Sequence, residues 1–157
     1  MASEAGFGNR DEQVRIVVVE DDVRDQELLF HRLRECQMDQ HLKFFTSGTA
    51  ALQFLSGANG RKVAGQLAAI FLDLNLPGIS GLELLRTLRR QSDLSNVPAI
   101  VITGSDDPAD LEECRRLGVA HYISKPITFA AFAKAIADTF QPSVKAVGGT
   151  RLASQPD

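Results

Sequence analysis

The sequence predicts an α/β domain in which helices cover both faces of a parallel β-sheet. Segments typical of strands and of helices alternate five times between residues 14 and 140, a pattern characteristic of a parallel sheet wound with helices. Three strand-like segments are apolar apart from the leading Arg15 of the first, as expected of central strands that are covered on both sides. These are residues 15–19, 68–72 and 98–102.

The two remaining strand-like segments are more polar. Residues 42–45 include Lys43, and residues 119–123 include His121 and Tyr122, which suits strands at the edges of a sheet. Strands one, three and four are therefore expected in the centre, with the second and fifth outside. This is the strand order 2-1-3-4-5 of a flavodoxin-like, doubly wound single domain.

Each strand is followed by a segment with helical periodicity, whereas residues 57–66 are expected to form a polar connection. Ser47 and Asp107 are expected to cap the starts of two of these helices. The expected apolar stripes contain Leu29, Leu33 and Cys36; Ala51, Phe54 and Leu55; Leu82, Leu85 and Leu88; Leu111, Cys114 and Leu117; and Phe129, Phe132, Ile136 and Phe140.

Composition restricts the classes of function. The 157 residues are 44% hydrophobic with a net charge of -3, which predicts one soluble domain without the basic excess of a nucleic-acid-binding protein. No apolar run approaches the roughly 20 residues needed to cross a membrane, and no secretory signal is visible, so a cytoplasmic location is expected. Residues 1–13 and 141–157 are expected to be flexible tails. Cys36 and Cys114 are expected to be buried, unpaired thiols.

Charged and polar residues follow four of the five strands. Because the carboxyl ends of parallel strands meet at one edge of a sheet, these residues are expected to lie together there. Carboxylates at such an edge repel each other by roughly 4 kcal/mol per pair at 4 Å, so the cluster needs cations. The residues are Glu20, Asp21 and Asp22 after the first strand, Asp73 after the third, Thr103 at the end of the fourth, and Lys125 after the fifth.

One Mg²⁺ ion together with Lys125 balances the charge of Glu20, Asp21 and Asp73. Mg²⁺ prefers oxygen ligands and retains water molecules that a phosphate oxygen can replace. The chain has no glycine-rich phosphate-binding loop after its first strand, which argues against a nucleotide as the ligand. The pattern therefore predicts a phosphoryl site whose phosphate comes from another source.

Four motifs resemble the receiver domain of two-component response regulators. They are Val17-Val18-Val19-Glu20-Asp21-Asp22, the segment from Leu72 to Gly81 that begins Leu-Asp-Leu-Asn, Ile102-Thr103-Gly104 and Ser124-Lys125-Pro126. The resemblance covers residues 14–140. It implies that Asp73 accepts a phosphoryl group from a phosphohistidine, and that the chain is a signalling protein rather than an enzyme acting on a separate substrate.

The resemblance also implies roles for the neighbouring residues. Asp21 is expected to bind Mg²⁺ directly and Glu20 through water, while Asn75 offers its main-chain carbonyl. Lys125 and Thr103 are expected to contact the phosphoryl group, and Thr103 with Tyr122 to form the conformational switch. The expected phosphodonor is a sensor histidine kinase or a histidine phosphotransfer protein. The face formed by residues 107–140 is expected to bind either a further partner or a second copy of the chain.

Some alternatives stay open. The acid pair is either Glu20 and Asp21, which we favour, or Asp21 and Asp22. A phosphohydrolase of the haloacid dehalogenase type needs an acid two residues after its nucleophile, where this chain has Asn75. A receiver-like scaffold that is not phosphorylated is the other rival. The short segment after residue 140 favours a stand-alone receiver, and residues 90–98 are similar to those of regulators that partner bacterial phytochrome kinases.

Overall fold

The computed structural model describes residues 11–57 and 60–140, so residues 1–10 and 141–157 of the predicted tails lie outside the described part. Five parallel strands form one sheet in the order β2-β1-β3-β4-β5, which confirms the predicted topology. The strands are β1 (Ile16–Val19), β2 (Leu42–Phe45), β3 (Ala69–Leu72), β4 (Ala99–Thr103) and β5 (His121–Ser124).

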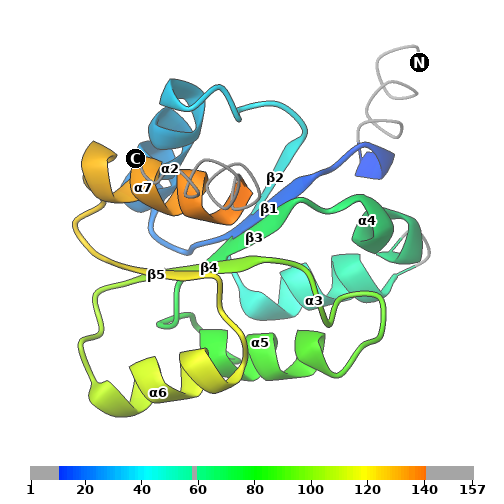
Figure 1. Ribbon diagram of the computed structural model, residues 1–157. Coiled ribbons are helices and arrows are strands. Elements are labelled where there is room, and N and C mark those ends of the chain that lie inside the picture. Colours follow the sequence, from blue (N-terminus) through cyan, green and yellow to red (C-terminus); the bar gives the residue numbers. More distant parts are fainter. Residues whose placement is uncertain (1–10, 58–59, 141–157) are drawn as a thin grey trace, which may run out of the picture.

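Helices cover both faces of the sheet (Figure 1). On one face lie α2 (Val23–Glu35) and α7 (Phe129–Phe140), and on the other lie α3 (Gly48–Ser56), α5 (Gly81–Arg89) and α6 (Pro108–Arg116). Side chains of a strand alternate between the two faces, so Val17 and Val19 of β1 join one core while Ile16 and Val18 join the other. No helix in the described ranges is long and apolar enough to span a membrane.

Three details of the sequence analysis are wrong. Residues 60–66 form the short helix α4 (Gly60–Gln66) within the segment expected to be a connection, because Val63 and Ala64 are buried against the core. Leu111 and Phe129 are not buried on the inner faces of their helices as expected. They are 42% and 49% exposed, since both lie in the first turns of their helices. Cys36 is only half-buried because it caps the end of α2, whereas Cys114 is buried as expected.

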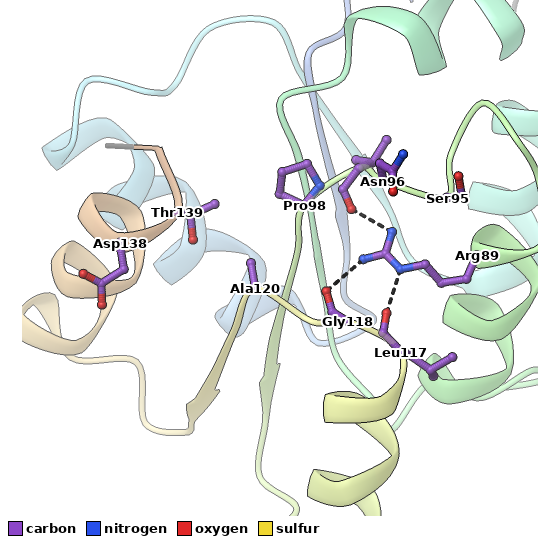
Figure 2. Close-up of a pocket in the computed structure, with 10 residues that line it drawn as sticks. Arg89, Ser95, Asn96, Pro98, Leu117, Gly118, Ala120, Asp138 and Thr139 are labelled. Atoms are coloured by element: carbon purple, nitrogen blue, oxygen red, sulfur yellow. Dashed lines mark hydrogen bonds between the residues drawn. The ribbon is translucent and has the colours of Figure 1, made fainter. Parts of the chain in front are cut away.

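Arg89, at the end of α5, holds together the two loops that precede β4 and β5. Its guanidinium donates hydrogen bonds to the main-chain carbonyls of Leu94 (3.2 Å), Val97 (2.7 Å), Leu117 (2.8 Å) and Gly118 (3.4 Å). Figure 2 shows three of these contacts beside a pocket of about 380 Å³. This pocket lies at the amino-terminal edge of the sheet, so it is separate from the charged residues at the carboxyl edge.

Candidate functional site

Two buried acids stand at the carboxyl ends of adjacent strands. The main chain of Glu20 donates to the Phe45 carbonyl (2.9 Å) and that of Asp73 to the Val19 carbonyl (3.1 Å), so the sheet hydrogen bonds continue into both residues. Carboxylate oxygens of Glu20, Asp21 and Asp73 all lie within 4.8 Å of one another. Glu20 and Asp73 are buried and Asp21 is exposed, so the cluster opens to solvent on one side.

Lys125 supplies the positive charge of this cluster. Its Nζ lies 2.8 Å from Asp73 Oδ2, 3.0 Å from Glu20 Oε1 and 2.6 Å from Asp25 Oδ2. The lysine follows β5, and its peptide bond to Pro126 is cis. Asp73 is thus paired with the cation that the sequence analysis assigned to it.

The electrostatics of the cluster favour a further cation. Burial, the largest influence, raises the pKa of Glu20 from 4.5 to about 7, against the lowering effect of its hydrogen bonds to Asp22 and Lys125. Burial alone would lower the pKa of Lys125, but its bonds to Asp25, Asp73 and Glu20 raise it above the ordinary value. A positive charge nearby stabilises the ionised form of a carboxylate. A second cation beside Glu20 would therefore favour its ionised form.

The geometry favours Glu20 and Asp21 over Asp21 and Asp22 as the acid pair. The side chain of Asp22 caps α2 by accepting a hydrogen bond from the main-chain N–H of Asp25 (3.1 Å). Asp22 is also absent from the group of close carboxylates in the described residues, which contains Glu20, Asp21 and Asp73. Whether these acids bind metal stays a prediction.

The loop after β3 keeps Asp73 in place. Asp73 Oδ1 accepts a hydrogen bond from the main-chain N–H of Asn75 (3.0 Å), and Gly81 donates to the Leu74 carbonyl (2.9 Å). A Cβ atom at Gly81 would collide with the main chain of Asp73 and Leu74. Because α5 begins against the loop that follows Asp73 at this point, only glycine fits there without a shift of the loop.

Thr103 and Tyr122 do not contact the carboxylates of the cluster through any hydrogen bond in the described residues. Thr103 is fully buried at the end of β4, and its Oγ1 accepts a hydrogen bond from the N–H of Ser105 (3.2 Å). Tyr122 is half-buried on β5, and its hydroxyl donates to the carbonyl of Ser105 (2.7 Å). The two predicted switch residues are therefore connected through one loop residue.

Asp25 is the residue at this site that the sequence analysis missed. It lies in the first turn of α2, where an acid is common because it complements the helix dipole. The sequence indicates that Asp25 lies three residues after Asp22, the cap of the helix. It does not indicate the contact of Asp25 with Lys125, which is 100 residues away in the chain. Only the folded arrangement of α2 and β5 reveals that contact.

Comparison with known proteins decides the family. Residues 16–137 match the response regulator receiver domain. The chain belongs to this family. Response regulator Rcp1 of Synechocystis sp. is 32% identical to this receiver over 110 residues, covering 70% of the chain and 75% of Rcp1. Two-component response regulator ARR7 of Arabidopsis thaliana is 28% identical, covering 75% of the chain, which spans only 58% of ARR7.

Solved receiver structures share the fold. The bacteriophytochrome response regulator RtBRR superposes with a TM-score of 0.70 at 35% identity, covering 81% of this receiver and 78% of RtBRR. The Mn²⁺-bound form of response regulator Rcp1 gives a TM-score of 0.67 at 29% identity, covering 81% and 93% of the two chains. The expected fold, family and strand order are therefore confirmed.

Proposed function

We propose that this receiver accepts a phosphoryl group on Asp73 from a phosphohistidine of a sensor histidine kinase or a histidine phosphotransfer protein, in a Mg²⁺-dependent reaction. One observation carries the proposal: a buried aspartate lies 2.8 Å from the Lys125 ammonium, beside two further carboxylates. Membership of the receiver family and the similarity to Rcp1 support it.

The residues of the cluster fit a hard divalent cation. Their donors are carboxylate oxygens close enough together to share one ion, and Mg²⁺ selects such donors while retaining water. A similar receiver structure is of a Mn²⁺-bound form. Glu20, Asp21, Asp73 and the carbonyl of Asn75 would hold the metal, which when bound would neutralise charge on the phosphoryl oxygens.

The transfer itself is a displacement at phosphorus. A carboxylate oxygen of Asp73 forms a bond to phosphorus as the bond from phosphorus to the histidine nitrogen breaks, leaving an acyl phosphate and a free imidazole. Lys125 offsets the negative charge of the transferred group, and Thr103 offers its hydroxyl to a phosphoryl oxygen, so the chain contributes mainly positioning and electrostatics. The protein modifies itself and turns over no separate substrate.

Two surfaces are suited to partners. Val23 and Phe129, 65% and 49% exposed, begin the helices that follow Asp22 and the Lys125 loop, and so offer apolar contacts to a phosphodonor protein beside Asp73. The second surface contains a hollow of about 360 Å³, which lies between α6 and β5 and is lined by Leu111 and Tyr122. We infer that the face formed by residues 107–140 binds an output partner or a second copy of the chain.

Phosphorylation by a small-molecule donor tests the proposal. Wild-type protein incubated with acetyl phosphate and Mg²⁺ should gain one phosphoryl mass in intact mass spectrometry, and chelation of the metal should prevent the gain. Asp73→Asn should gain none. A wild-type protein that takes up no phosphoryl group with Mg²⁺ present would indicate the rival function, a receiver-like scaffold that is not phosphorylated.

A further inference from the structure

The ammonium of Lys125 has no hydrogen-bond donor to spare. An ammonium carries three N–H donors, and three carboxylate oxygens surround this one, from Glu20 (3.0 Å), Asp73 (2.8 Å) and Asp25 (2.6 Å). A phosphoryl oxygen that approaches Lys125 must therefore take the place of one of these carboxylates.

Asp25 differs from the other two carboxylates. Glu20 and Asp73 have side chains only 1% and 6% exposed, and both belong to the group of acids close enough to share a metal ion. Asp25 is outside that group, projects from α2, and is 29% exposed, yet it makes the shortest contact with Lys125. Of the three carboxylates bonded to Lys125, Asp25 is the one that neither the proposed metal binding nor the proposed phosphoryl transfer requires.

Asp25 also alters the charge balance. One divalent cation and Lys125 offset the three charges of Glu20, Asp21 and Asp73, whereas Asp25 adds a fourth negative charge next to the ammonium. A carboxylate bonded to Lys125 weakens the attraction of that lysine for phosphoryl oxygens. Without Asp25 the ammonium would still be held by two buried carboxylates, so its position does not depend on this third contact.

We propose that Asp25 is a positioning residue that competes with the phosphoryl group for Lys125 and thereby slows phosphorylation of Asp73. The proposal rests on the function proposed above. It assigns to α2 a direct influence on the speed of the phosphoryl reaction, exerted through the lysine rather than through contact with the phosphate.

The rate of phosphorylation by acetyl phosphate at saturating Mg²⁺ tests the proposal. Asp25→Asn should raise the rate constant roughly two- to fivefold, the range expected when one partly exposed ion pair is lost. Asp25→Glu, which keeps the charge, should stay close to wild type. Glu27→Gln removes the same charge from an exposed position on α2 and should leave the rate unchanged. An unchanged or lower rate in Asp25→Asn would overturn the proposal.

A second readout needs no phosphorylation. The ammonium resonance of Lys125, assigned by its loss in Lys125→Arg, should show solvent exchange several-fold faster in metal-free Asp25→Asn than in wild type. Unchanged exchange would contradict the competition. The two proposals fail differently: a wild type that takes up no phosphoryl group defeats the proposed function, whereas normal phosphorylation of Asp73 at the same rate in Asp25→Asn defeats only the role of Asp25.

Discussion

The hydroxyl of Tyr122 donates a 2.7 Å hydrogen bond to the main-chain carbonyl of Ser105. The same loop residue donates its N–H to Thr103 Oγ1 and its own hydroxyl to Asp110 Oδ2 (2.7 Å) in α6. A rotation of the Thr103 hydroxyl toward a phosphoryl group would remove one of the bonds that hold this loop. Because Ser105 also bonds to Tyr122 and to α6, a shift of this loop would change the positions of both.

We therefore expect Thr103→Ala to accept phosphate on Asp73 but to lose the conformational response. In wild type, phosphorylation should change hydrogen exchange across α6, β5 and α7, because the proposed contact between Thr103 and the phosphoryl group can form only after transfer. In the variant, exchange across this face should be the same with and without phosphate. Wild-type exchange that does not respond to phosphorylation would rule out this relay even if Asp73 is modified.

Substitution of the two neighbouring acids should separate metal binding from helix capping. Asp21→Ala should abolish Mg²⁺ binding and phosphorylation, because Asp21 lies in the carboxylate cluster. Asp22→Ala should retain both and lose about 0.5–2 kcal/mol of unfolding free energy, because it removes the cap of α2. Calorimetric titration with Mg²⁺ and urea denaturation measure the two effects. Metal binding lost in Asp22→Ala and kept in Asp21→Ala would show that Glu20 and Asp21 are not the acid pair.

The Arg89 contacts should contribute to the free energy of unfolding and not to the rate of phosphorylation. Lysine cannot reproduce the planar fork that reaches four carbonyls, so Arg89→Lys should lower the free energy of unfolding by about 1–3 kcal/mol. The phosphorylation rate of the folded variant should equal that of wild type, since this arginine lies at the opposite edge of the sheet. Arg90→Lys, at an exposed neighbouring position, is the control and should change neither quantity.

The two thiols should differ in reactivity. Burial raises the pKa of Cys114 to about 11 and also raises that of Cys36, which is only half-buried. With Ellman's reagent at pH 8, Cys36 should react first and Cys114 only as the protein unfolds. The rate for Cys36 should still increase between pH 8 and pH 9, because its thiolate fraction is still rising there. Rapid reaction of folded Cys36→Ser would contradict this assignment.

Most of the sheet and of the site could be predicted from the sequence for a simple physical reason. Apolar runs such as residues 98–102 identify buried strands, and parallel topology then places the residues after these strands at one edge. Glu20, Asp73 and Lys125 are consequently neighbours, as expected. The strand order follows from the polarity of the edge strands, so it required no knowledge of side-chain packing.

The features that could not be predicted depend on local geometry or on distant packing. Helix α4 is short and contains two glycines, so its propensity for helix is weak, and burial of Val63 stabilises it instead. The apolar spacing of α6 and α7 does not reveal that Leu111 and Phe129 precede the part of each helix that packs on the sheet. Asp25 has the appearance of an ordinary first-turn acid, and its role depends on a contact across the fold.

The central claim, that Asp73 carries the phosphoryl group, is tested most directly by identifying the modified residue. Borohydride reduces an aspartyl phosphate to homoserine, which a peptide map by mass spectrometry locates within the sequence. After treatment with acetyl phosphate and Mg²⁺, we expect homoserine at position 73 and at no other aspartate, and none in a sample prepared without the donor. Homoserine at Asp21 or Asp22, or none anywhere in fully treated wild type, would contradict the claim.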